Sequence, residues 1–230
     1  MIKENLATIQ RTISEVCKRT GRSESEVTLI AVSKTKPLSM IEEAYEAGMR
    51  EFGENKPQEM RDKARDFANP VNWHMIGNLQ ANKIKYVVGT ACLIHSVDSV
   101  TLAAAIEKEA SKKELVMDIL LEVNIAKEDS KHGLLEEEVV PAVLEIAKFP
   151  HLRMKGLMTV APYTENAEEN RIYFRKMKEL LVDINAKNID NVFMDILSMG
   201  MSSDYEVAIE EGATMVRVGT GIFGERNYSL

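Results

Sequence analysis

The stretch at residues 215–230, MVRVGTGIFGERNYSL, decides between two α/β folds. Gly219, Gly221 and Gly224 spell G-x-G-x-x-G, a pattern typical of the turn between a strand and a helix that binds a dinucleotide. A dinucleotide-binding fold continues after this turn with a crossover helix and a further strand, whereas only six residues follow Gly224. The three glycines therefore require a different interpretation.

Upstream of this stretch, short apolar runs alternate with helical patterns. The runs lie at residues 28–32, 50–52, 72–76, 92–96, 116–123, 154–160, 192–198 and 214–218. Runs rich in Val, Ile, Leu and Met without strict alternation are typical of parallel strands covered on both faces. Eight strand-and-helix units in this length predict a (β/α)8 TIM barrel, with an open doubly wound sheet as the alternative.

The remaining pattern concerns the first 21 residues and the third unit. Leu6, Ile9, Ile13 and Val16 recur at helical spacing in a charged segment, which predicts an extra amphipathic helix before the first strand. The third unit, at residues 78–87, has room only for a short helix. We expect residues 1–230 to form a single domain, because one core can serve a chain of this length.

Composition narrows the function to small-molecule chemistry. The net charge is -7, which argues against a nucleic-acid or anionic-membrane partner, and no apolar run has the length of a membrane span. Cys17 and Cys92 are too few and too isolated for disulfides or zinc, so we expect buried thiols, no metal and a cytoplasmic location. The four histidines lack metal spacing, and hydrogen-bonding roles are expected for them.

Two lysines directly follow the first predicted strand. Lys34 comes at the strand end, where active sites of barrels are built, and Lys36 lies two residues further on. A lysine in a barrel mouth with little water and a second cation nearby has a lowered pKa and can form a Schiff base with a carbonyl. The alternative is that both lysines are solvated loop charges.

The loops after the last two strands explain the terminal glycines. Gly200, Ser202, Gly219, Thr220 and Gly221 would bring backbone N–H groups and hydroxyls around a phosphate, although tight turns alone could also require the glycines. In a closed barrel this phosphate cup neighbours the first strand and Lys34. An aldehyde that carries a phosphate is pyridoxal 5'-phosphate (PLP), which becomes the expected cofactor.

Motifs along the whole chain point to a known family. The segments AVSKTKP, FGEN, WHMIGNLQANK, HSVDS, GLMT, LSMGMSSD and MVRVGTGIFGERNYS closely resemble the YggS/PROSC family of pyridoxal phosphate homeostasis proteins. That family is similar to the N-terminal barrel of alanine racemase. The resemblance implies a cytoplasmic, mostly monomeric protein that binds PLP and maintains vitamin B6 homeostasis, with no established catalytic reaction.

The resemblance also implies a role for each matching residue. Lys34 would carry PLP, Lys36 would help to handle or transfer it, and Arg217 would face the pyridine nitrogen. Ser202, Gly219 and Thr220 would bind the phosphate, while Asn55 and Met199 would line the ring. The chain departs from the family pattern at Lys56, Pro57 and Asn78, which affects the rim of the expected pocket.

Three functions are open at this point. The first is a carrier that holds and releases PLP, with apo forms of PLP-dependent enzymes as further partners. The second is a PLP-dependent racemase or lyase of low activity. Arg217 disfavours the second, because an arginine stays protonated and leaves the facing pyridine nitrogen a weak electron sink.

Tyr163 is the nearest candidate for a racemase's second base. The third function, a cofactor-free Schiff-base aldolase, leaves Arg217 and the phosphate loops unexplained.

Overall fold

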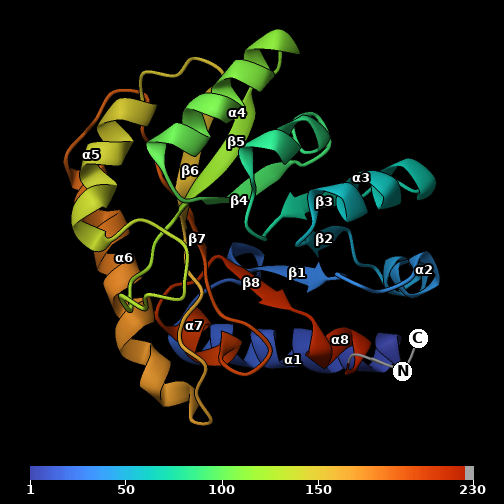
Figure 1. The fold of residues 1–230 in the computed structure, drawn as a ribbon. Coiled ribbons are helices and arrows are strands. Elements are labelled where there is room, and N and C mark those ends of the chain that lie inside the picture. The colour runs from blue at the N-terminus through green and yellow to red at the C-terminus, as the bar shows by residue number, and fades with distance from the viewer. Residues whose placement is uncertain (226–230) are drawn as a thin grey trace.

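Eight parallel strands form a closed barrel in chain order, as Figure 1 shows in the computed structural model, which describes residues 1–225. The last strand pairs with the first, so the barrel is confirmed and the open sheet is wrong. The strands are β1 (Thr28–Val32), β2 (Glu51–Glu54), β3 (Asn72–Met75), β4 (Leu93–Val97), β5 (Met117–Glu122), β6 (Leu152–Met158), β7 (Ile196–Ser198) and β8 (Met215–Val218).

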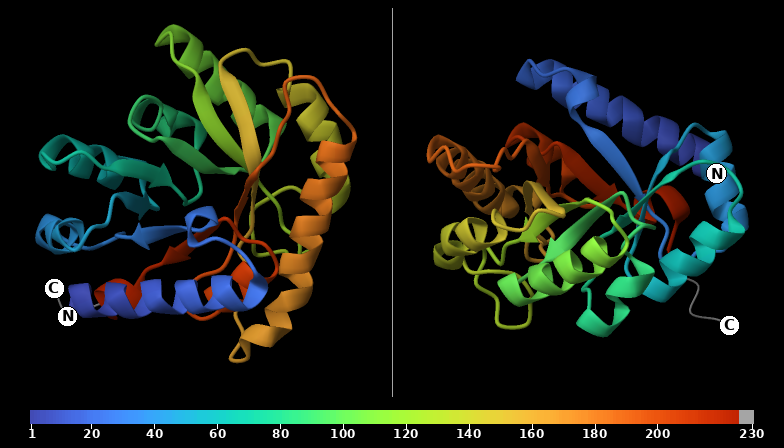
Figure 2. Two further views of the ribbon diagram at one scale, coloured as in Figure 1. Left: turned by 180° about the vertical axis from the view of Figure 1, so that it is seen from behind. Right: turned by 90° about the horizontal axis from the view of Figure 1, so that it is seen from above.

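Helices surround the barrel (Figure 2). They are α1 (Ile2–Thr20), α2 (Leu38–Glu46), α3 (Pro57–Asp66), α4 (Val100–Lys112), α5 (Glu136–Ile146), α6 (Arg171–Ala186), α7 (Tyr205–Glu210) and α8 (Thr220–Phe223). Three short 3-10 helices complete the described elements: η1 (Glu24–Glu26), η2 (Ala81–Tyr86) and η3 (Ala167–Asn170). The third unit thus has the short helix that the sequence predicts, here η2. Among residues 1–225, no helix combines the length and the apolar composition that crossing a membrane requires.

The predicted N-terminal helix is α1, and it occupies a place in the outer ring. It contacts α2, α7 and α8, and it runs beside α8 and α7 in both views of Figure 2. Leu6, Ile9, Ile13 and Val16 are buried on one face of α1, as their helical spacing predicts. Because α8 has only four residues, α1 packs beside it and takes the place in the outer ring that a longer eighth helix would fill.

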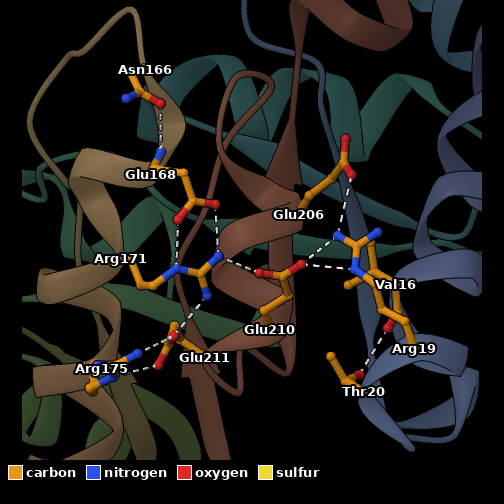
Figure 3. Close-up of polar contacts among 10 residues, drawn as sticks. All are labelled: Val16, Arg19, Thr20, Asn166, Glu168, Arg171, Arg175, Glu206, Glu210 and Glu211. Atoms are coloured by element: carbon orange, nitrogen blue, oxygen red, sulfur yellow. Dashed lines mark hydrogen bonds and ion pairs between the residues drawn. The ribbon is translucent and has the colours of Figure 1, made fainter.

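A network of ion pairs connects α1 with α6 and α7 (Figure 3). Glu210 of α7 accepts hydrogen bonds from Arg19 of α1, at 2.5 and 2.8 Å, and from Arg171 of α6 at 2.5 Å. Arg171 also pairs with Glu211 at 2.8 Å and with Glu168 at 2.7 Å. One carboxylate therefore joins α1 to α6 and α7, which lie more than 150 residues later in the sequence.

Alternation along the strands separates an interior core from an outer core. The interior cluster consists of Leu93, Leu120 and Met158, while the larger cluster fills the space between strands and helices. The strand register also places polar side chains in the interior of the barrel. Arg217 of β8 lies opposite Ile30 of β1, and His74 of β3 lies opposite Gly53 of β2. The inside of the barrel is therefore partly polar.

Two expectations were wrong in detail. The seventh strand is limited to Ile196–Ser198, because the backbone N–H and C=O of Met194 hydrogen bond to the Asn185 side chain and not to a neighbouring strand. Cys17 is buried as expected, but Cys92 is exposed, since it lies in the connection that enters β4 rather than within the strand.

Candidate functional site

Donors from the loop after β8 converge on one hydroxyl at the C-terminal end of the barrel. The Oγ atom of Ser202 accepts hydrogen bonds from the backbone N–H of Gly219 at 3.3 Å and of Gly221 at 3.4 Å, and from the hydroxyl of Thr220 at 3.2 Å. These bonds are long, and therefore weak, compared with the usual 2.9 Å. The structure therefore brings together the residues predicted for a phosphate cup, and the binding of an anion by these three donors stays a prediction.

The loop after β7 presents Ser202 to these donors. Gly200 has a φ of +91°, and a Cβ atom there would lie 2.5 Å from the Cβ of Ala208, so the turn requires glycine. Asp204 is buried and accepts a hydrogen bond from the Met201 backbone N–H at 2.7 Å, while the Gly200 carbonyl accepts one from the Arg217 N–H at 3.0 Å. The loop is thereby held against β8.

The cup lies against the end of β1, where the two candidate lysines are. A Cβ atom on Gly219 would lie 3.4 Å from the Cβ of Val32, which places the backbone of the cup in contact with the last residue of β1. Lys34 follows two residues later and is half-buried. Lys36 donates from Nζ to the carbonyls of Phe223 and Gly224 at 3.2 Å, at the end of α8. The structure thus brings the lysine turn and the cup together.

The turn that carries Lys34 has an unusual backbone conformation. Thr35 has a φ of +63°, a region that costs a β-branched residue more than it costs glycine or asparagine. The turn is closed by the Lys36 N–H, which donates to the Ser33 carbonyl at 3.0 Å, and the Thr35 N–H donates to Glu59 at 2.6 Å. A side chain of α3 therefore fixes the backbone between the two lysines.

A buried lysine underlies this turn, and the sequence interpretation missed it. Lys63 of α3 donates from Nζ to the Ser33 carbonyl at 2.8 Å, to Glu54 at 2.7 Å and to Glu59 at 2.7 Å. Ser33 donates from its hydroxyl to the same Glu54 oxygen at 2.6 Å. Lys63 follows Glu59 by four residues in a helix that is rich in charged residues. Its burial therefore could not be predicted from the sequence. The available signal was Glu54, a carboxylate at the end of the short strand β2 that needs a cationic partner if it is buried.

Glu54 contributes a carboxylate that is not fully satisfied. Its side chain is entirely buried, and burial raises its pKa despite the opposing effect of Lys63. Its second oxygen, Oε2, has no hydrogen-bond partner among the described residues. The Lys63 cation is therefore what compensates this buried charge.

Arg217 points into the barrel from β8. Only 4% of its surface is exposed, and it donates to the Ser198 hydroxyl at 2.6 Å and to the Thr159 carbonyl at 2.8 Å. Burial lowers its pKa to about 10, partly offset by Glu122 and Asp204. The guanidinium consequently stays charged at neutral pH and is fixed in place by β6 and β7.

A chain of hydrogen bonds continues from Arg217 across the barrel. Ser198 Oγ lies 2.9 Å from His95 Nδ1, His95 Nε2 lies 2.9 Å from His74 Nδ1, and His74 Nε2 lies 2.7 Å from Glu51. Since Arg217 can only donate, the Ser198 hydroxyl is assigned as donor to His95, and each histidine then carries its proton on Nε2. Burial keeps the pKa of His95 well below its usual value, so the ring is neutral.

Asn55 and Met199 are less informative than the other predicted residues. Asn55 directly follows β2, and its backbone lies very close to Gly77. A Cβ atom added to Gly77 would lie 2.4 Å from the Asn55 carbonyl oxygen. Met199 is completely buried in the outer core between strands and helices. Contact of either side chain with a cofactor ring stays a prediction.

A small cavity of about 190 Å³ opens beside the end of β5. It is lined by Glu122, Val123, Asn124, Ser130, Lys131, His132 and Val160. Burial, together with the nearby Asp98, raises the pKa of Glu122 to about 7, against the effect of Arg217. His132 bonds to Asn78 at 3.0 Å, linking the loops after β5 and β3. Asn78, where the chain departs from the family pattern, is thus part of the barrel rim.

Comparison with known proteins agrees with this arrangement. The model of the family described as alanine racemase, N-terminal domain, matches residues 5–227. The pyridoxal phosphate homeostasis protein of Aquifex aeolicus is 44% identical over 98% of both chains, and that of Escherichia coli K12 is 40% identical over 99% of this chain and 98% of its own. PipY of Synechococcus elongatus, solved with PLP bound, has a TM-score of 0.84 and 33% identity, covering 97% of this chain and 100% of its own.

Proposed function

Because the chain belongs to the alanine racemase N-terminal domain family, and within it to the pyridoxal phosphate homeostasis proteins, we propose that it binds PLP reversibly and maintains the cellular supply. One observation carries the proposal: the donors of Gly219, Thr220 and Gly221 converge on Ser202 beside the end of β1, from which Lys34 follows. Residues 226–229 of the last family motif lie outside the described residues.

The residues present fit the cofactor. PLP supplies an aldehyde that a lysine amine attacks to form a Schiff base, and Lys34 would provide that amine. Ser202, Gly219 and Thr220 would bind the phosphate, Asn55 and Met199 would line the ring, and Lys36 would keep the cup closed by binding the end of α8. Arg217 would meet the pyridine nitrogen, since it is buried, charged and fixed by two hydrogen bonds.

We propose binding without a catalytic reaction of its own. A charged arginine keeps the nitrogen that faces it unprotonated, which disfavours carbanion chemistry at the amino-acid α-carbon. Tyr163, the sequence candidate for a second base, is 90% exposed. If the protein were a racemase or lyase, alanine or serine in deuterium oxide would exchange its α-proton with turnover. We expect no exchange above that of free PLP.

The biological setting extends the same proposal. We propose a cytoplasmic monomer that delivers PLP to apo forms of PLP-dependent enzymes, and the net charge of -7 supports small-molecule rather than nucleic-acid partners. Light scattering after size exclusion tests the monomer. Reactivation of an apo enzyme, faster with the loaded protein than with the same concentration of free PLP, tests delivery.

Borohydride reduction in the presence of PLP tests the anchor directly. We expect one pyridoxyl adduct per chain by intact mass, located on Lys34 by peptide mapping, and absent or moved to Lys36 in Lys34→Ala. Lys36→Ala is the matched control, and it should keep the adduct on Lys34. An absent adduct in the wild type, or one spread over surface lysines, contradicts the proposal.

A further inference from the structure

Three potential metal ligands meet at the N-terminal end of the barrel, opposite the phosphate cup. Glu51 begins β2, His74 lies within β3, and Cys92 immediately precedes β4. These three strands are neighbours in the barrel (Figure 1). One ligand atom from each residue, a carboxylate oxygen, an imidazole nitrogen and a sulfur, lies within 4.8 Å of the other two.

We propose that Glu51, His74 and Cys92 bind a divalent ion of the zinc type. Carboxylate, imidazole and thiolate together are the donors that zinc takes in proteins, and three protein ligands leave a fourth position for water. The sequence interpretation expected no metal, because the two cysteines are isolated and the histidines lack metal spacing; Cys92 is 18 residues from His74. In the closed barrel, β3 and β4 are neighbours, which brings His74 and Cys92 together.

The distances suit a tetrahedral ion. Zinc holds nitrogen at about 2.0 Å and sulfur at about 2.3 Å, which sets the two donor atoms roughly 3.5 Å apart. His74 Nε2 lies 3.5 Å from Cys92 Sγ. Glu51 Oε2 is closer, at 2.7 Å from His74 Nε2, and would withdraw by roughly half an ångström to coordinate the ion. Its side chain is 26% exposed and can rotate to do so.

Accessibility and support from behind the ligands also favour the site. Cys92 is exposed as a residue, so an ion can approach it from solvent. Partial burial of the thiol and the nearby Glu51 raise its pKa to about 12, so the ion must displace the proton of the sulfur as it binds. His74 is buried and its Nδ1 lies 2.9 Å from His95 Nε2, which orients the ring in the way that metal-binding histidines usually require. Coordination through Nε2 would place the His74 proton on Nδ1, with His95 accepting it. Both histidines would then switch from the Nε2–H to the Nδ1–H tautomer without a net change in charge, and the Ser198 hydroxyl would accept from His95 instead of donating to it.

Such an ion would join the starts of β2, β3 and β4. Because the formed site exists only in the folded barrel, the ion would raise the temperature of unfolding, and the stabilisation would grow with the logarithm of the ion concentration once this exceeds Kd. This role is independent of PLP, which belongs at the other end of the barrel. The proposal therefore does not rest on the proposed function.

The test uses the untagged full-length protein without PLP, because PLP itself chelates metals. Zinc titrated against a chromophoric chelator should show one site per chain and a higher melting temperature. Cobalt should give the strong near-ultraviolet absorption of a thiolate ligand. In Cys92→Ser, whose altered side chain is exposed, we expect the cobalt–thiolate absorption to disappear and zinc affinity to fall at least tenfold.

Two further variants make the outcome decisive. Cys17→Ser changes the other cysteine, which is a buried residue of α1, and this variant should bind both metals like the wild type. Glu51→Gln should weaken zinc while retaining the cobalt–thiolate absorption. The proposal is wrong if the wild type binds no stoichiometric zinc, or if the cobalt–thiolate absorption persists in Cys92→Ser.

Discussion

At the scale of single residues, Glu122 couples the inside of the barrel to pH. Its pKa is raised to about 7 from 4.5 by burial, so the folded protein binds a proton that the unfolded chain releases between these values. A raised carboxyl pKa contributes stability that is present below about pH 4.5 and lost as the pH rises through 7.

We therefore expect the wild type to lose up to about 3 kcal/mol of unfolding free energy between pH 5 and pH 8 through this group. Glu122→Gln, which cannot ionise, should lack this loss and should gain on the wild type as the pH rises. Urea unfolding at both pH values measures the difference. Equal pH slopes in the two proteins would show that Glu122 titrates normally.

Thr35 is the second residue whose local conformation allows a prediction. It has a φ of +63°, and its side chain is exposed. Thr35→Asn should raise the free energy of unfolding by about 1 kcal/mol, because asparagine tolerates this conformation better than a β-branched residue. Thr35→Val keeps the branch and should bring no gain. A stabilisation of both variants alike would locate the effect elsewhere.

At the scale of elements, α3 controls the turn after β1 through Lys63. Lys63→Met removes the cation from the buried Glu54, and we expect a loss of about 3 kcal/mol or more in stability. It also releases the Ser33 carbonyl at the base of the lysine turn, so PLP binding should weaken at least tenfold in a spectroscopic titration.

The double variant Lys63→Met with Glu54→Gln separates these two effects. Removing the unpaired carboxylate should recover part of the stability, whereas PLP affinity should stay low because the turn still lacks its lysine. Wild-type PLP affinity in a folded Lys63→Met protein would contradict a positioning role for Lys63.

The bounds of the strands could largely be predicted from the sequence, whereas contacts between elements could not. The first strand has the predicted bounds at 28–32, and the other predicted runs each overlap a strand, because strands buried on both faces are uninterrupted apolar segments. The proximity of Ser202 to Gly219, Thr220 and Gly221 could be predicted, because glycines and hydroxyls follow the last two strands; their binding of phosphate stays a prediction. The links of Lys63 to Ser33 and of His74 to His95 could not, since each depends on which strands and helices become neighbours.

At the scale of the whole molecule, Glu210 joins α1, α6 and α7. Glu210→Gln leaves Arg19 and Arg171 near each other without their shared carboxylate. We expect a loss of about 1–2 kcal/mol in stability at low ionic strength, and a smaller loss in 1 M salt, which screens charges.

Glu206→Gln is the control on the same helix. Its pair with Arg19 is longer, at 3.7 Å, and more exposed, so it should cost little at any salt concentration. Hydrogen bonds to Arg171 and Arg19 lower the pKa of Glu210, so its contribution should be present above pH 4.5 and lost on acidification. Equal losses in the two variants would argue against a joint of three helices.

The position of α1 in the outer ring has a consequence for synthesis of the protein. The apolar face of α1 packs in part on α7 and α8, so its partners leave the ribosome roughly 200 residues later, about 10–40 s at common elongation rates. During that interval part of the apolar face of α1 is exposed and can contact other nascent chains. Until α7 and α8 have been made, α1 can pack only on α2 and the early strands, so we expect its burial to be completed among the last steps of folding.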